Sequence, residues 1–306
     1  MASSLARLAL HGSRASRVSL SQRAAACSSF RAMGPLASSA ASAPARSSQI
    51  FARAMNTGVP PPPQNGAQIP GFEEPPKEVT LNQAIAVGET VLMYLEQALP
   101  GKQLDQLYKE KSKSSVVTRM RKMLGLYIGT QLYVLGPFGF QGSQEGLEQF
   151  ARLQMQMLQG KSPEMDEVQE LRKLSSETWS IMVQRAFGIK VIPELTQDQV
   201  RFAASRVSSN LQDPTFLKMV EDTFKNEIQP LAAAGKQEEA IDKLQEAMIP
   251  CYINVLQTMN VESLPPTDEG YVLLQVCMNQ NMGDPAVAQA IMSGFGAVQA
   301  RAPIGF

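Results

Sequence analysis

The residues that most often carry enzymatic chemistry are scarce in this chain. It has one histidine, His11, and three cysteines, Cys27, Cys251 and Cys277. Histidine is the commonest general base, a member of the usual serine and cysteine nucleophile pairs, and a frequent ligand of zinc and iron. Because His11 lies in a segment that we expect to be removed, the mature chain has no histidine for these roles. We predict no catalytic, cofactor-binding or metal-binding residue, and therefore no cofactor.

The two cysteines of the mature chain lie in apolar surroundings. Cys251 stands in "IPCYINVL" and Cys277 in "LLQVCMNQ", and their spacing matches no metal-ligand pattern. Free cysteine behaves as a small apolar residue and is usually buried. We therefore expect two buried, unreactive thiols rather than a disulfide or a redox pair.

Carboxylates are the remaining candidates for acid–base chemistry. They gather in two runs, one at Glu164, Asp166, Glu167 and Glu170 and the other at Glu238, Glu239, Asp242 and Glu246. Their spacing places them on polar helix faces beside lysine and arginine, where solvated ion pairs are the ordinary outcome. An enzyme that uses carboxylates in a helical pocket stays open as an alternative, although no E-x-x-H pair is available for a di-iron bundle.

Two glycine-containing segments resemble phosphate loops without meeting their requirements. The run "GPFGFQG" at 136–142 lacks the G-x-G-x-x-G spacing and a preceding strand. Gly160-Lys161-Ser162 lacks the first glycine of a nucleotide-binding loop, since that position is Met155. We expect a helix-terminating loop in the first segment and reject nucleotide binding in the second.

The charge of the chain is divided between two unlike parts. The whole sequence is neutral, with 28 basic and 28 acidic residues. No acidic residue precedes Glu73, whereas seven arginines do, so the chain from there on has 21 basic against 28 acidic residues, a net charge of −7. These arginines are Arg7, Arg14, Arg17, Arg23, Arg31, Arg46 and Arg53. An acidic body disfavours nucleic acid as a partner.

The arginine-rich part predicts an organelle transit peptide over residues 1–55. It is rich in Arg, Ser and Ala, contains no acid, and has no uninterrupted apolar core of the kind a secretory signal needs. A cationic amphipathic helix is drawn toward anionic membranes and an inside-negative potential. We therefore predict a mitochondrial location, in the matrix or on the matrix side of the inner membrane, and favour it over the plastid. Residues 56–77, which hold Pro60 to Pro63, are expected to form a proline-rich linker or extended arm.

The rest of the chain predicts an all-α domain over 78–301, followed by a short tail at 302–306. Thr80 precedes a helical apolar pattern that we expect to end at Pro100-Gly101, and Ser162 is expected to cap a helix that stops at Gly188. Further helix starts are predicted at Thr196, Asp213-Pro214 and Asp284-Pro285. We expect an irregular bundle or array of about eight to ten helices behind a disordered N-terminal segment. The 16 methionines suit irregular cores and adaptable interfaces.

One apolar segment invites comparison with a membrane helix. Residues 123–140 carry no charge and follow a basic stretch at 109–122. Gly125 and Gly129 have the spacing that allows two helices to approach closely. A buried central helix and a membrane-spanning or interfacial helix both fit, because glycines, Gln131 and Pro137 dilute the hydropathy. The candidate membrane or partner contacts are Leu124, Gly125, Tyr127, Ile128, Gly129, Leu132 and Tyr133.

Two short segments resemble known helical families. "PLAAAGKQEEAIDKLQEAMIP" at 230–250 resembles the middle of a tetratricopeptide repeat, with Gly235 at the turn and Ala240, Leu244 and Ala247 at packing positions. No second copy follows at the required period, so a generic helical hairpin remains open. "MGDPAVAQAIMSGFGAV" at 282–298 is similar to the Asp-Pro-rich modules of heat-shock co-chaperones, and no function is transferred from it.

These observations predict a non-enzymatic structural or accessory subunit of a mitochondrial multiprotein assembly. We expect its partners to be other subunits of an inner-membrane oxidative-phosphorylation complex, either ATP synthase or a respiratory complex, with membrane contact through 123–140 as a further option. A soluble matrix adaptor or co-chaperone-like helical-repeat protein is the alternative, because of the hairpin at 228–250.

Overall fold

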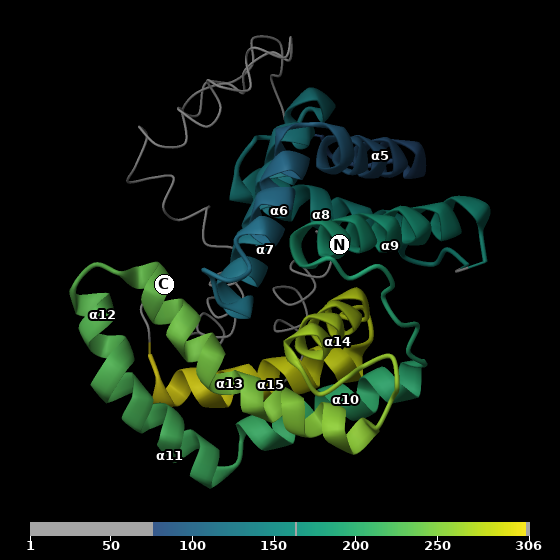
Figure 1. The fold of residues 1–306 in the computed structure, drawn as a ribbon. Helices are drawn as coiled ribbons and strands as arrows, with labels where there is room; N and C mark the ends of the chain where they lie inside the picture. The colour runs from purple at the N-terminus through teal and green to yellow at the C-terminus, as the bar shows by residue number, and fades with distance from the viewer. Residues whose placement is uncertain (1–75, 163, 304–306) are drawn as a thin grey trace. The chain divides into compact units, whose positions relative to one another are not determined.

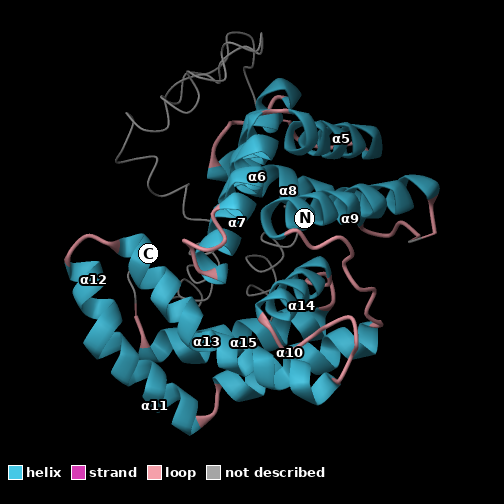
Figure 2. Cartoon of the chain, in the orientation of Figure 1, coloured by secondary structure: helices cyan, strands magenta, loops and turns pink. Residues whose placement is uncertain are grey.

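The computed structural model describes residues 76–162 and 164–303, and these residues form an all-α fold. Figure 2 shows helices joined by loops, and no strand occurs within the described ranges. They contain 10 helices when α11, η3 and α12 are taken as one continuous helix, which confirms the predicted fold class. The predicted transit peptide at 1–55 and most of the linker at 56–77 lie outside the described residues.

The helical region was expected as one domain over 78–301, and the structure divides it into two compact units (Figure 1). In the described residues, unit 1 comprises 76–109 and 122–188, and unit 2 comprises 110–121 and 189–303. The division falls within α7 (Val116–Leu135), so its first six residues belong to unit 2 and the rest to unit 1.

Unit 1 contains α5 (Leu81–Gln97), α6 (Leu99–Lys109), most of α7, the 3₁₀ turn η2 (Gly136–Phe138), α8 (Gln144–Leu158) and α9 (Asp166–Phe187). Helix α9 packs against both α5 and α6, and α5 also contacts α8. Its core includes Leu95, Leu104, Met123, Leu135 and Met182, all fully buried.

Unit 2 contains α10 (Gln197–Leu211), α11 (Pro214–Thr223), the π-helix η3 (Phe224–Ile228), α12 (Gln229–Ala233), α13 (Gln237–Met259), α14 (Asp268–Gln280) and α15 (Pro285–Arg301). Helices α10 and α15 pack closely, and α13 contacts α10, η3, α12 and α14 (Figure 1). At the α10–α15 contact, a Cβ on Gly294 would lie 3.0 Å from Ser208 Cα, so a larger residue there would displace its neighbours by a few tenths of an ångström.

The helix starts follow the local sequence at most positions. Thr80 and Thr196 each form the predicted capping box, with Gln83 and Gln199 returning a hydrogen bond to the cap backbone. Asp213 and Asp284 cap α11 and α15 in front of Pro214 and Pro285. Helix α9 ends as predicted at Gly188, which has φ 78°.

Two predicted boundaries are wrong. Helix α5 ends at Gln97, before Pro100 and Gly101, which lie in the first turn of α6 instead of ending α5. Proline is tolerated there because the N–H groups of a first turn have no acceptor within the helix. Ser162 does not cap α9, which begins at Asp166; its Oγ accepts a hydrogen bond of 3.2 Å from the Glu164 N–H in a local turn.

The repeat-like segment forms a helical hairpin whose second helix is longer than a repeat helix. Gly235 occupies the turn with φ 75°, and Ala240 and Leu244 are buried as expected. Pro250 lies inside α13, which continues to Met259. Burial of the apolar residues beyond Pro250, including Tyr252, stabilises the helix despite the missing N–H.

The glycine run at 136–142 ends a helix, as predicted. Gly136 begins η2 directly after α7, and Gly139 adopts φ 87° with its N–H donating to the Gly136 carbonyl at 2.9 Å. The segment at 189–195, whose pattern alternates like a strand but contains Pro193, is irregular.

Candidate contact face of α7

The seven predicted contact residues all lie on α7, in the part that belongs to unit 1. Gly125, Tyr127 and Ile128 are buried, whereas Leu124, Gly129, Leu132 and Tyr133 are half-buried. The structure therefore separates residues that pack within unit 1 from residues that retain an accessible surface.

Tyr127 anchors α7 within unit 1. Its ring lies 6.1 Å from the Trp179 ring of α9, measured between centroids. Its hydroxyl oxygen accepts a hydrogen bond of 2.8 Å from Gln131 Nε2, and burial raises the pKa of the phenol well above its ordinary value. Such a neutral, packed phenol stabilises the α7–α9 contact.

Tyr133 contacts α5 through an edge-to-face pair with Tyr94, whose ring centroid is 5.3 Å away. Partial burial and the hydrogen bond with Tyr94 raise the pKa of Tyr133 to about 12. The ring is held in place by this pair and remains partly accessible.

Gly129 has open space beside its backbone. A Cβ built at Gly129 would find no atom within 4 Å. Leu126, Leu132 and Tyr133 lie three or four residues away, on the same side of the helix, and all are half-buried. We call Leu126, Gly129, Leu132 and Tyr133 the α7 contact face.

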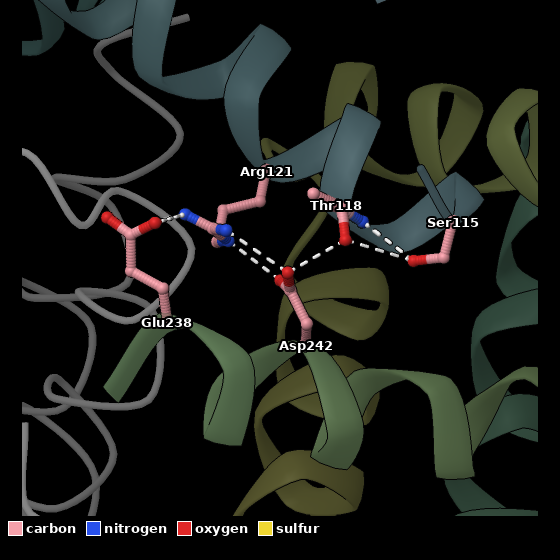
Figure 3. A network of polar contacts seen from close by, with 5 residues as sticks. All are labelled: Ser115, Thr118, Arg121, Glu238 and Asp242. Carbon is pink, nitrogen blue, oxygen red and sulfur yellow. Dashed lines mark hydrogen bonds and ion pairs between the residues drawn. The ribbon is translucent and has the colours of Figure 1, made fainter. Parts of the chain in front are cut away.

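The first turns of α7 carry a buried polar network that the sequence did not reveal (Figure 3). Arg121 donates from Nε to Asp242 Oδ1 at 2.7 Å and from a terminal nitrogen to Asp242 Oδ2 at 3.1 Å. Its other terminal nitrogen lies 2.9 Å from a Glu238 carboxylate oxygen. Thr118 Oγ1 donates to Asp242 Oδ2 at 2.8 Å and lies 3.1 Å from Ser115 Oγ. All five residues belong to unit 2.

This network joins α7 to α13 and corrects one expectation. Asp242 was predicted on a solvated helix face, but it is buried, with 8% of its surface exposed. Burial disfavours the charged form of Arg121, but hydrogen bonds and charges from Asp242 and Glu238 outweigh it and raise the arginine pKa. The buried carboxylate and guanidinium therefore compensate one another in a structural pair.

The other acidic candidates lie at the surface. Glu164, just before α9, and Asp166, Glu167 and Glu170 in its first turns are exposed. In α13, Glu238 and Glu239 are exposed and Glu246 is half-buried. Among the described residues, no group of three or more His, Cys, Asp or Glu side chains is arranged to hold a metal ion.

Cys251 and Cys277 are free and buried, as predicted. Burial, together with the Asp213 charge in the case of Cys251, raises the pKa of each thiol to about 12. Cys277 Sγ donates a weak hydrogen bond to the Pro193 carbonyl at 3.5 Å. Both sulfurs are protonated at neutral pH and therefore unreactive.

Comparison of the chain with protein-family models, curated proteins and solved structures finds no match. None of the helices within 76–162 and 164–303 combines the length and apolarity needed to cross a membrane.

Proposed function

We propose that this protein is a non-catalytic structural or accessory subunit of a mitochondrial multiprotein assembly. The proposed host is an inner-membrane oxidative-phosphorylation complex, either ATP synthase or a respiratory complex, with the protein in the matrix or on the matrix side of the membrane. The acid-free, arginine-rich residues 1–55 support the location.

The observation that carries the proposal is the α7 contact face. Gly129 leaves more than 4 Å of open space where any other residue would place a Cβ, and partly accessible apolar side chains flank it. A glycine in a helix interior costs about 0.5–1 kcal/mol relative to alanine, and a contact that only glycine permits would offset this cost. Close approach of a neighbouring subunit's helix would supply that contact.

The polar groups of the described helices support a structural role. Arg121 joins α7 to α13. Arg185 of α9 binds Asp105 of α6 and the carbonyls of Leu95 and Glu96 in α5. Arg201 of α10 binds Asp284, which caps α15. Each of these arginines stabilises the position of one helix against another.

Native gel separation of organelle extracts, with mass spectrometry of each fraction, tests the assembly. We expect the protein to migrate with the subunits of one oxidative-phosphorylation complex. Migration solely as a monomer of its processed mass would refute the proposal.

A pair of glycine variants tests the α7 contact face directly. Gly129→Leu fills the open space with an isobutyl group and should abolish co-migration, while thermal unfolding of the isolated chain stays unchanged or shifts upward. Gly296→Leu is the matched control, because Gly296 lies in α15 and a Cβ there also meets no atom within 4 Å. Normal assembly of the Gly129→Leu variant would show that this face contacts no partner.

A further inference from the structure

Residues 189–195 form an exposed, extended segment at the start of unit 2. From 189 to 195 the structure has no helix, turn or bend, so the chain runs there without a sharp change of direction. Pro193 fixes its own φ at about −65° and disfavours a helical conformation of Ile192 before it. Lys190, Val191 and Glu194 are exposed, Val191 by 74%. We call residues 189–195 the extended segment.

One edge of the extended segment faces α14. The Cys277 Sγ of α14 donates a weak hydrogen bond of 3.5 Å to the Pro193 carbonyl. In an extended chain, the N–H and the carbonyl of one residue point to the same edge, and those of the next residue point to the opposite edge. The backbone groups of Lys190, Ile192 and Glu194 therefore point away from α14. Within the described residues, no hydrogen bond engages the N–H or the carbonyl of these three residues.

The extended segment is complementary to itself when two copies run antiparallel. With Ile192 of one copy opposite Ile192 of the other, Lys190 of each copy lies opposite Glu194 of the other. Opposite charges in directly opposed positions stabilise a pair of strands, whereas two parallel chains would place like charges side by side. Neither Lys190 nor Glu194 makes an ion pair elsewhere in the described part of the chain. The charges of this segment therefore favour a second copy in antiparallel orientation.

The position of Pro193 fits the same alignment. Directly opposed residues of an antiparallel pair alternate between those that exchange two backbone hydrogen bonds and those that exchange none. Because the backbone groups of Ile192 point away from α14, the two Ile192 residues belong to the first kind, and Pro193 opposes Val191 in a position of the second kind. A proline is tolerated there because the pair needs no N–H from it. The same contact would cover the exposed valine.

We infer that two copies of this chain associate through their extended segments as a short antiparallel β-ribbon. The hydrogen-bonding residues are Lys190, Ile192 and Glu194 of each copy, and the two-fold axis passes beside Ile192. A contact made by one short segment of each chain is smaller than a standard interface, so the dimer is weak and exchanges with the monomer. The association uses no residue of the α7 contact face and therefore does not depend on the proposed subunit role.

Sedimentation velocity of the full chain, at loading concentrations from micromolar to millimolar, tests the inference. Lys190→Glu places carboxylates opposite one another across the ribbon, and Glu194→Lys places ammonium groups opposite one another. The double variant Lys190→Glu/Glu194→Lys restores the opposite-charge pairs with their signs exchanged. Lys218→Glu and Glu262→Lys are the matched controls, because they make the same changes of net charge at other exposed positions of unit 2.

We expect the parent, both controls and the double variant to dimerise with similar dissociation constants. Each single variant turns two attractive pairs into repulsive ones, so its dissociation constant should rise on the order of tenfold or more. In the parent, cleavage by trypsin after Lys190 should also slow at concentrations where the dimer forms, because pairing covers the accessible backbone.

A parent that stays monomeric over the whole range would overturn the inference. Single variants that dimerise as tightly as the parent, or a double variant that does not recover, would overturn it as well. If Lys190→Glu weakens co-migration with other subunits on a native gel while the isolated parent stays monomeric, the segment binds a different chain and the inference is wrong.

Discussion

At the scale of single residues, the described part of the chain uses its charged groups to compensate one another inside the protein. Arg121 binds two carboxylates that differ in their exposure to solvent. The Arg121 side chain is 6% exposed, whereas the Glu238 side chain is 62% exposed. Asp242 shares the arginine's buried environment. The burial of each carboxylate therefore decides how much its bond to Arg121 contributes to stability.

Replacing Asp242 should cost far more stability than replacing Glu238. Asp242→Ala leaves the buried Arg121 without its main counter-charge and removes the carboxylate acceptor of the Thr118 hydroxyl, so we expect the free energy of unfolding to fall by about 3–5 kcal/mol. Glu238→Ala removes a solvent-screened pair and should cost less than about 1 kcal/mol. Urea unfolding followed by circular dichroism measures both values, and equal losses would contradict a buried structural pair.

The two buried thiols predict slow alkylation and loss of stability at high pH. In a Cys27→Ser background, Cys251 and Cys277 should react with iodoacetamide at pH 8 at least a thousandfold more slowly in the native chain than in urea, because only the thiolate reacts. In the unfolded chain the thiols ionise near pH 8.5, whereas in the native chain they keep their protons until about pH 12.

The sign of the pH effect follows from this difference. Unfolding releases thiol protons above pH 8.5, so the free energy of unfolding falls as pH rises, by about 1–2 kcal/mol for each thiol at pH 10. In the Cys251→Ala and Cys277→Ala variants, the free energy of unfolding should fall less between about pH 8.5 and about pH 10 than in the parent. Rapid alkylation of either cysteine under native conditions would contradict its burial.

At the scale of elements, Asp284 joins the start of α15 to α10. Its carboxylate accepts from the Ala286 and Val287 N–H groups and from Gln197 Nε2 and Arg201 Nε, at 2.6 to 3.4 Å. Burial raises the Asp284 pKa, but these donors outweigh it and leave the pKa below its ordinary value. One side chain thus caps a helix and fixes its position.

Asp284→Ala should therefore lower the free energy of unfolding by more than the loss of a helix cap alone would. We expect a loss of about 2–4 kcal/mol, since the cap and the charge-assisted bonds to α10 disappear together. Asp213→Ala is the matched control, because Asp213 caps α11 through Thr215 and Phe216 N–H groups only, and should cost about 1 kcal/mol. The difference in free energy of unfolding between the parent and Asp284→Ala should narrow as pH falls below about 4, because the unfolded carboxylate then takes up a proton before the native one does. If both variants lost the same free energy of unfolding, the bonds from Asp284 to Gln197 and Arg201 of α10 would contribute nothing to stability.

Elements also show how proline is accommodated within helices. Pro230 has no N–H for a regular helical bond, and the chain before it adopts the π-helix η3, in which the Gln229 N–H donates to the Phe224 carbonyl. The helix therefore continues from α11 into α12 instead of stopping.

At the scale of the whole molecule, the chain passes from unit 1 into unit 2 after Gly188 through an irregular segment. Residues 189–195 include exposed Lys190 and Glu194, and Val191 is 74% exposed. Arg185, by contrast, lies within α9 and is held by Asp105.

Limited proteolysis should reveal this difference. Trypsin should cleave after Lys190 well before it cleaves after Arg185, because cleavage needs an extended, accessible backbone. Mass spectrometry of early fragments gives the order of cleavage. Cleavage after Arg185 at an equal rate would contradict the helical, paired state of α9 at that residue.

Local sequence determined the helical class and many helix ends, because capping bonds and apolar spacing act over three or four residues. Thr80, Thr196, Asp213 and Asp284 each start a helix where their neighbours predict it. The tertiary structure alone decided that Asp242 is buried, since its partner Arg121 is remote in sequence and no local pattern joins them. It also decided that Tyr127 packs inside unit 1 while Gly129 stays open, because the packing of α9 and α5 selects which residues of one apolar helix are covered.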